Sequence, residues 1–159
     1  MTRGIFKIHQ RVPVSAAGDL VLLYPKWVPG GHSPRNEVRN VAGIRVSANG
    51  QPLKWMRDPL DVYAFHVSVP QGVSAVDVDF QYLSSTAENM GRTVMTPEMS
   101  SIQWLSLSMY PAGYYVRQIP VQASVVVPSG WKVATALRPR TQNGGRFDYP
   151  VTSYEILVD

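Results

Sequence analysis

Residues 76–83 read Val-Asp-Val-Asp-Phe-Gln-Tyr-Leu, and this stretch decides the fold class. Apolar and polar side chains occupy alternate positions, with Val76, Val78, Phe80 and Tyr82 opposite Asp77, Asp79 and Gln81. A period of two is typical of a β-strand that has one face on the core and the other in water. The stretch therefore predicts a half-buried strand.

The same period extends outward in both directions. Residues 62–69 alternate cleanly, and Asn49-Gly50 lies between the strand-like residues 43–48 and 52–56. Asn-Gly is a strong hairpin signal, because both central residues of a type I′ turn need a positive φ. Further strands are predicted at residues 5–14, 20–24, 102–110, 114–127, 131–137, 146–149 and 153–158. We predict an all-β fold, a two-sheet β-sandwich-like domain with little or no helix, as one domain over residues 1–159.

Composition excludes several functional classes. The chain of 159 residues has no cysteine, so it can form no disulfide, no cysteine-based zinc site and no catalytic thiol. Its net charge of +4 comes from scattered lysines and arginines, so we predict no nucleic acid partner. No apolar run is long enough for a membrane helix, so we predict no membrane partner. No leader peptide is apparent, and the compartment stays open between bacterial cytoplasm and periplasm.

The chain carries no complete catalytic motif. Its histidines, His9, His32 and His66, lack the H-E-x-x-H spacing of zinc peptidases, and no G-x-S-x-G or phosphate loop is present. His9 and His66 are interpreted as ordinary strand residues, whereas His32 lies in a loop. The acids at positions 77 and 79 are explained by a solvated strand face. We therefore predict no catalytic residue and no metal site in this chain.

Residues 23–36, LYPKWVPGGHSPRN, form the most unusual segment. Three prolines stiffen it, and it brings Trp27, His32 and Arg35 into one loop. Aromatic and polar side chains on a stiff loop predict a contact surface. The alternative is a structural loop in which Trp27 plugs the end of the sandwich.

Two further segments stand out. In residues 94–99, VMTPEM, Glu98 lies between two methionines, and in an apolar pocket it could pair with a cation. The alternative is an ordinary surface acid. Residues 109–117 are dense in tyrosine, which turn chemistry and aromatic packing explain.

These segments together resemble the N-terminal domain of the glycyl aminopeptidase family of zinc metallopeptidases, of the thermolysin-like clan. The resemblance rests on Trp27-Val28-Pro29-Gly30, Asn40-Val41-Ala42-Gly43, Asn49-Gly50, Asp61-Val62-Tyr63-Ala64-Phe65, Val94-Met95-Thr96-Pro97-Glu98, Tyr110-Pro111-Ala112-Gly113 and Pro150-Val151-Thr152-Ser153-Tyr154-Glu155. It covers nearly the whole chain.

The resemblance implies a β-rich domain that precedes a catalytic domain, which would be its partner and would bind zinc through H-E-x-x-H and a downstream Glu. The cofactor would thus lie in a domain that this chain lacks, and the isolated chain would be inactive. By analogy, Glu98 would hold the α-amine of a peptide substrate, and Trp27, His32 and Arg35 would be wall residues. The alternatives are a free-standing β-sandwich module that binds peptide or carbohydrate, and a structural domain that binds a protein partner.

Overall fold

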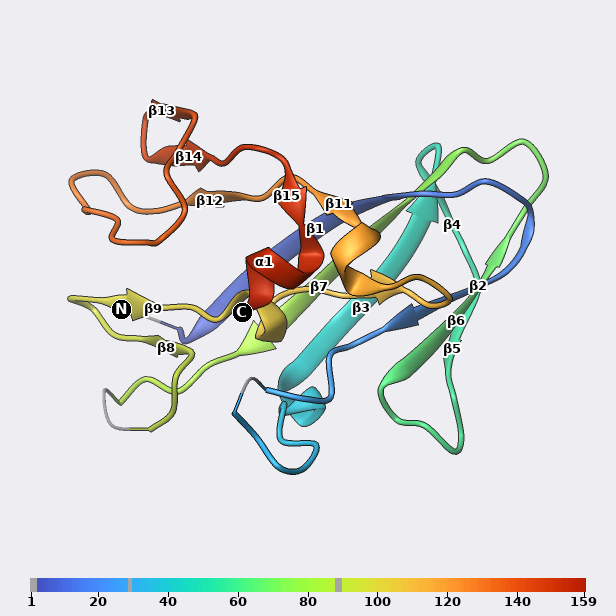
Figure 1. The fold of residues 1–159 in the computed structure, drawn as a ribbon, viewed down its shortest axis with the longest axis horizontal. Helices are drawn as coiled ribbons and strands as arrows, with labels where there is room; N and C mark the ends of the chain where they lie inside the picture. The colour runs from blue at the N-terminus through green and yellow to red at the C-terminus, as the bar shows by residue number, and fades with distance from the viewer. Residues whose placement is uncertain (1–2, 29, 88–89) are drawn as a thin grey trace. The chain divides into compact units, whose positions relative to one another are not determined.

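The structure is a computed structural model that describes residues 3–28, 30–87 and 90–159 (Figure 1). The chain divides into two compact units, Met1–Gly113 and Tyr114–Asp159. One domain over residues 1–159 stays a prediction. Pro29 of the W-x-P-G motif, and residues 88–89 of a polar loop, lie outside the described residues.

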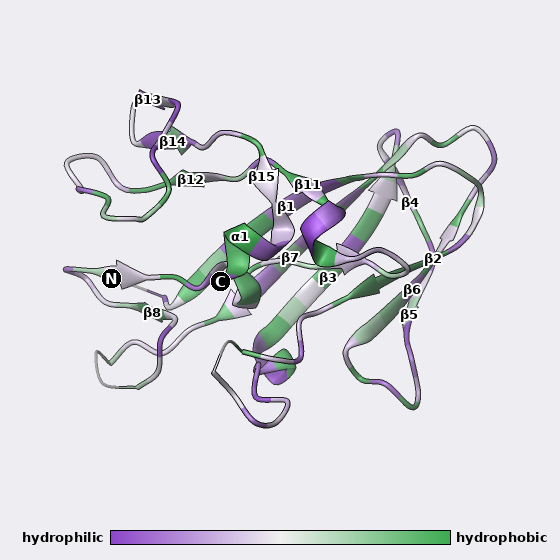
Figure 2. Cartoon of the chain, viewed as in Figure 1, coloured by the Kyte–Doolittle hydropathy of each residue, from purple (hydrophilic) through white to green (hydrophobic). Residues whose placement is uncertain are grey.

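The predicted strand at residues 76–83 lies inside the first sheet of the first unit. This sheet has the order β1 (Ile5–Pro13), β7 (Ala75–Leu83), β3 (Val41–Ala48) and β4 (Gln51–Pro52), and all neighbours are antiparallel. The apolar face of β7 is fully buried, as the alternation predicts. Figure 2 shows hydrophobic and hydrophilic residues alternating along the long strands.

The second sheet completes a sandwich. Its order is β10 (Tyr110–Pro111), β2 (Gly18–Leu23), β6 (Ala64–Val69) and β5 (Trp55–Arg57), again antiparallel. Side chains from both sheets, together with three from connecting segments (Tyr24, Leu107 and Met109), form one core. The strand residues of this core are Val12, Leu22, Val41, Val46, Phe65, Val67, Val69, Val76, Val78, Phe80 and Tyr82. The prediction of an all-β fold is confirmed.

The chain changes sheet directly after its Asn-Gly turn. Asn49 has φ 50° and Gly50 φ 77°, as a type I′ turn requires. The predicted return strand at residues 52–56 is only partly formed, because β4 ends at Pro52 and residues 55–56 belong to β5 in the other sheet. The Leu53 N–H donates to a carbonyl of β3 over 2.8 Å, whereas the next carbonyl, that of Lys54, accepts from an N–H of β6 over 3.0 Å. Two adjacent residues therefore join the two sheets.

The rest of the first unit is irregular. It contains the hairpin of β8 (Val94–Met95) and β9 (Ser100–Ser101) and two 3₁₀ turns, η1 (Val38–Asn40) and η2 (Trp104–Ser106). The strand predicted at residues 102–110 is wrong except at its end, where β10 begins. Residues 105–109 are buried without interruption, so their environment does not alternate as it would on a half-buried strand.

The second unit holds shorter elements. Here η3 (Val116–Gln118) precedes β11 (Pro120–Val121), which pairs with β15 (Thr152–Ser153). A separate sheet has the order β12 (Ser124–Val126), β14 (Arg146–Asp148) and β13 (Thr141–Asn143). The long strand predicted at residues 114–127 is therefore only partly formed.

Two predictions in the second unit are wrong. Residues 131–137 form no strand, and the Trp131 N–H instead closes a turn on the Pro128 carbonyl over 3.2 Å. Most of residues 153–158 forms a short helix, α1 (Tyr154–Val158). Ser153 caps it by accepting from the Ile156 N–H over 3.3 Å, and Glu155 is an acid in the first turn. This capping outweighs the weak alternation of the segment. Among the described residues, no helix has the length and hydrophobicity needed to span a membrane.

Candidate functional site

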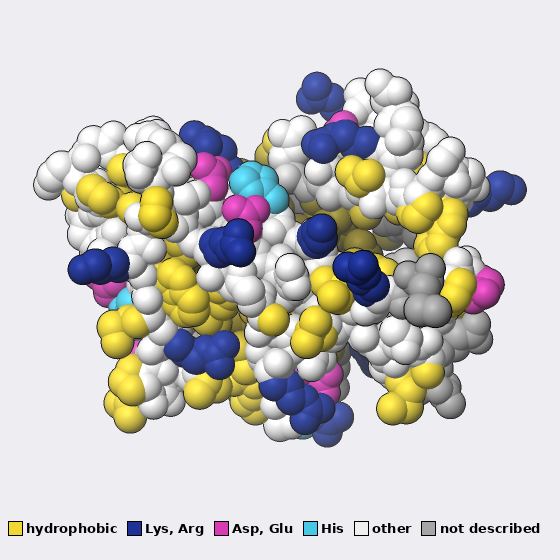
Figure 3. Space-filling model, turned by 180° about the vertical axis from the view of Figure 1, so that it is seen from behind, with side chains coloured by type: hydrophobic (Ala, Val, Ile, Leu, Met, Phe, Trp, Pro, Cys, Tyr) yellow, Lys and Arg dark blue, Asp and Glu magenta, His cyan; other side chains and the backbone are white. Residues whose placement is uncertain are grey.

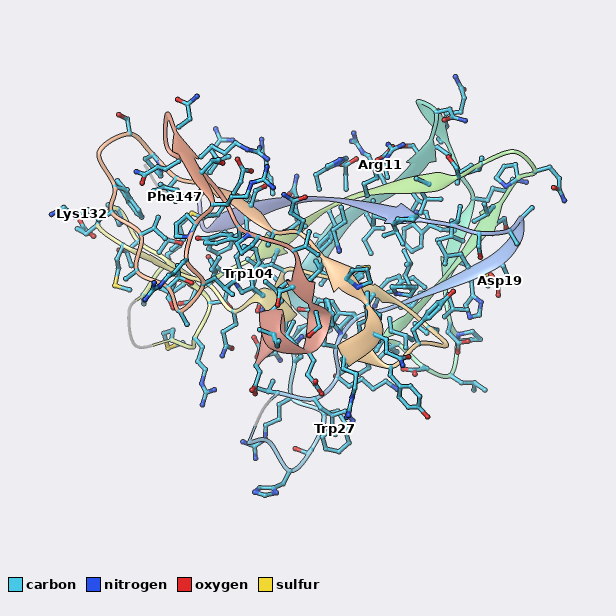
Figure 4. The ribbon with its side chains drawn as sticks, turned by 45° about the horizontal axis from the view of Figure 1, so that its top comes forward. Arg11, Asp19, Trp27, Trp104, Lys132 and Phe147 are labelled. Atoms are coloured by element: carbon cyan, nitrogen blue, oxygen red, sulfur yellow. The ribbon has the colours of Figure 1, made fainter. Side chains whose placement is uncertain are left out.

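Three of the four predicted binding residues lie on one loop of the first unit, the Trp27 loop (residues 24–28 and 30–36). Trp27 is 57% exposed, and His32 and Arg35 are exposed as well. Figure 4 shows Trp27 at the lower edge of the view, outside the strands. An indole with this exposure does not plug the end of the sandwich, so that alternative is wrong. The loop presents its aromatic side chain to a partner or to solvent.

The base of the Trp27 loop is buried and polar. Asn36 is 4% exposed, and its Nδ2 donates to the carbonyls of Pro25 and Leu105, each over 2.9 Å. Its Oδ1 accepts from Ser106 Oγ over 3.1 Å. Tyr24 Oη lies 3.4 Å from Oδ1 and donates to the Ser106 carbonyl over 3.0 Å. This side chain was not predicted to have a role. A single polar residue in a loop rich in Pro and Gly carries no signal of burial.

A charged pair holds the residue before Trp27. The Lys26 ammonium donates to Asp61 and lies 5.6 Å from the centre of the Tyr63 ring. The hydrogen bond from Lys26 lowers the pKa of Asp61, and burial raises the pKa of Tyr110, which lies near both charges. The Tyr63 ring stacks on Tyr24, with centroids 6.5 Å apart. The loop base is thus aromatic as well as hydrogen-bonded.

The fourth predicted residue, Glu98, lies at the tip of the hairpin formed by β8 and β9, the Glu98 hairpin (residues 94–101). Thr96 organises this tip: its Oγ1 accepts from the N–H groups of Glu98 (3.2 Å) and Met99 (3.1 Å). Glu98 is exposed and Met99 is 41% exposed, so no apolar pocket encloses the carboxylate. Within the described ranges, no side chain forms an ion pair or hydrogen bond with it. Glu98 is a surface acid here.

The structure does not bring the four predicted residues together. In Figure 1 the Glu98 hairpin and the Trp27 loop occupy different sides of the first unit. A cavity of about 350 Å³ in the same unit is lined by residues such as Glu37, Asn40 and Arg92, and none of the four predicted residues lines it. The candidate site is therefore two separate surfaces.

His66 is more than the ordinary strand residue predicted. Its Nδ1 lies 2.7 Å from Asp19 Oδ2, and its Nε2 lies 3.0 Å from Asp58 Oδ2. The hydrogen bonds with Asp19 and then Asp58 raise the pKa of His66. The pKa of Asp58 falls to about 2, chiefly because its carboxylate accepts the N–H groups of Asp61 and Leu60 and then because it bonds His66. The alternation of residues 62–69 predicted a strand at His66, but it carries no signal for the two acids beside the ring.

The outer face of the first sheet is charged, as its alternation predicts. Arg11 Nη1 donates to both carboxylate oxygens of Asp77 over 3.1 and 3.2 Å, and His9 Nδ1 lies 2.9 Å from Asp79 Oδ1. Figure 3, seen from behind, shows a histidine among acidic and basic side chains. Asp77 and Asp79 are thus paired with basic side chains on a solvated sheet face, as ordinary surface acids are.

No metal centre is found in the described part of the chain. There, no group of three or more His, Asp or Glu side chains could hold a metal ion. These described residues thus offer no donor set that fits the zinc of a metallopeptidase.

Comparisons with known proteins agree with the fold. The model of the peptidase M61 N-terminal domain matches residues 1–159. Among solved structures, an aminopeptidase N family protein from Idiomarina loihiensis superposes with a TM-score of 0.80 at 18% identity, over 99% of this chain and 26% of that one. The chain thus spans about a quarter of that protein, and at this identity the likeness shows the fold alone. No match was found among curated proteins. Because the family model matches its entire length, the chain belongs to the peptidase M61 N-terminal domain family.

Proposed function

We propose that this chain is the non-catalytic N-terminal domain of a zinc aminopeptidase of the glycyl aminopeptidase type, in the thermolysin-like clan. It would cap the cleft of its own catalytic domain and help to select peptide N-termini. The observation that carries the proposal is the match of residues 1–159 to a peptidase N-terminal domain. The solved aminopeptidase of like fold is a much longer protein, which agrees with a second, catalytic part.

Glu98 is the proposed ligand of the substrate's α-amine. An exopeptidase must hold this ammonium group, and a carboxylate does so through a charge-assisted hydrogen bond. Glu98 suits the task because it is exposed and makes no ion pair within the described ranges. Trp27, His32 and Arg35 are the proposed wall residues, since they share one exposed loop.

Zinc would be bound outside this chain, because the described residues contain no fitting donor set. In such enzymes the metal activates a water molecule and polarises the scissile carbonyl. The task left to this chain is to bind and orient the peptide. The isolated chain is expected to hydrolyse no peptide, with or without added zinc.

The test uses the full-length protein that contains this chain, with a glycyl-anilide substrate and its N-acetylated form. We expect Glu98→Gln to lower kcat/KM on the free amine by about tenfold or more, because an ion-paired hydrogen bond is lost. Zinc content should not change. Asp79→Asn, which removes an exposed acid from the first sheet, is the matched control and should leave the kinetics unchanged.

Equal kinetics for Glu98→Gln and the parent protein would refute the amine-binding role. Hydrolysis by the isolated chain would refute the non-catalytic role. A free-standing peptide- or carbohydrate-binding module is the competing function, favoured by the 57% exposure of Trp27. It would be supported if the full-length protein had no peptidase activity and Trp27→Ala abolished binding of an immobilised peptide or oligosaccharide.

A further inference from the structure

The base of the Trp27 loop is closed by one buried side-chain amide, that of Asn36. A side-chain amide has two N–H donors and an oxygen with two lone pairs. Asn36 donates to the carbonyls of Pro25 and Leu105 and accepts from Ser106 Oγ. The Tyr24 hydroxyl lies 3.4 Å from the Asn36 oxygen and 3.0 Å from the Ser106 carbonyl, so it links the two residues. Asn36 thereby joins the loop to residues 105–106.

Backbone bonds close the loop at the residue that precedes Trp27. The Lys26 carbonyl accepts from the N–H groups of Arg35 and Asn36, over 3.0 and 3.2 Å. The Asn36 carbonyl in turn accepts from Tyr63 Oη over 3.2 Å. The Lys26 ammonium is held separately by Asp61. Lys26, the residue before Trp27, is thus held twice. Its carbonyl accepts two N–H groups of the loop, and its ammonium is bound to Asp61.

The indole itself is left exposed above this fixed base. Ordering a flexible loop at the moment of binding costs free energy, whereas a loop ordered during folding has already met that cost. A rigid base under an exposed aromatic ring is the arrangement expected of a pre-organised binding surface.

We propose that Asn36 is a positioning residue that holds the Trp27 indole in place for the first residues of a peptide substrate. The identity of the ligand as a peptide rests on the proposed function, whereas the positioning of Trp27 by Asn36 does not depend on it. Asn36 itself, at 4% exposed, does not touch the substrate and acts through the loop.

The test follows Trp27 directly, in full-length protein labelled with 5-fluorotryptophan. The ¹⁹F resonance of Trp27 is assigned by its loss in Trp27→Phe. The first variant is Asn36→Ala. Ser106→Ala removes the donor to Asn36 Oδ1, and Tyr24→Phe removes the hydroxyl that lies between Asn36 Oδ1 and the Ser106 carbonyl. We expect the Trp27 resonance to shift or broaden in all three, most in Asn36→Ala. If Asn36→Ala does not fold, the two milder variants decide.

Ser108→Ala is the matched control. Ser108 is a buried serine of the same segment, but its Oγ donates to the Trp104 carbonyl over 2.7 Å rather than to Asn36. The Trp27 resonance should not change in this variant. An unchanged resonance in the folded Asn36, Tyr24 and Ser106 variants would overturn the proposal, and so would an equal change in Ser108→Ala.

Kinetics separate this inference from the proposed function. Ser106→Ala should lower kcat/KM by about two- to tenfold, the worth of one hydrogen bond, mainly through KM. It should add nothing in a Trp27→Ala background, because its effect passes through Trp27. An added loss in that background would refute positioning through Trp27. If Trp27→Ala leaves the kinetics unchanged, the wall role in the proposed function fails, and the ¹⁹F result still decides the positioning.

Discussion

The Trp27 loop and the Glu98 hairpin were predicted to share one task, yet the fold holds them in different ways. The loop is tied by a buried amide to residues about 70 positions further along the chain, through bonds to Leu105 and Ser106. The hairpin tip is held by Thr96, two to three residues away from its partners. The loop is therefore fixed by tertiary structure and the hairpin tip by local structure. The two regions therefore differ in how far along the chain the contacts that hold them reach.

The largest effect should come from Asn36→Ala. This change removes the donor to two buried carbonyls and the acceptor of the Ser106 hydroxyl, and we expect a loss of about 2–4 kcal/mol in the free energy of unfolding. Urea denaturation of the 159-residue chain measures it. A loss below about 1 kcal/mol would show that the tertiary hydrogen bonds of the loop base stabilise the protein no more than the local ones of the hairpin tip.

A smaller effect is expected from Thr96→Val in the Glu98 hairpin. The substitution keeps the shape and removes the oxygen that accepts from Glu98 and Met99. By analogy with capping hydroxyls, the loss should be about 1 kcal/mol. Amide hydrogen exchange should accelerate at residues 98–99 and stay unchanged at Arg35 and Asn36. Faster exchange in the Trp27 loop would show that the two regions are coupled.

Lys26→Met should have a still smaller effect on stability. Both partners of the Lys26–Asp61 pair have about a third of their side chain exposed, so solvent weakens the attraction, and about 0.5–1 kcal/mol is expected. The long apolar stem of methionine keeps the packing. The loss should shrink at high salt, as chemical denaturation with urea at two salt concentrations would show. A loss that is independent of salt would point to packing instead of charge.

The pH dependence of His66 gives the last prediction. Its raised pKa means that the stabilising charge is complete below the ordinary value of 6.5 and is lost as pH rises through the raised pKa. We expect the midpoint of thermal unfolding to fall over that range, and less so in His66→Gln. NMR titration of the His66 ring should give a lower pKa in Asp19→Asn. Asp79→Asn, on the other sheet, is the control that should leave this titration unchanged.

The sequence predicted the elements whose environment alternates. The strand β7 is clear because its face on the core and its face in water differ at every step along the chain. The turn at Asn49 and Gly50 is equally clear, because few residues adopt a positive φ twice in succession. The short helix α1 was missed, since five residues are too few to establish a helical period.

The candidate site was less predictable than the fold. Trp27 and Glu98 could be chosen for their chemistry, but Asn36 acquires its role from Leu105, which is 69 residues away. His66 is similar, with one acidic partner 47 residues away and the other only 8. Pairings over such separations are set by strand register and loop closure, which the local pattern of one sequence does not encode.

The change of sheet between Leu53 and Lys54 has a consequence for folding. One residue is hydrogen-bonded to the first sheet and the next to the second, and side chains of both sheets share one core. The two sheets are expected to form and melt together, in one cooperative transition. The strand order also joins residues that are far apart in the chain, which makes the search for native pairs slow. The first unit should therefore fold slowly and as a single cooperative unit.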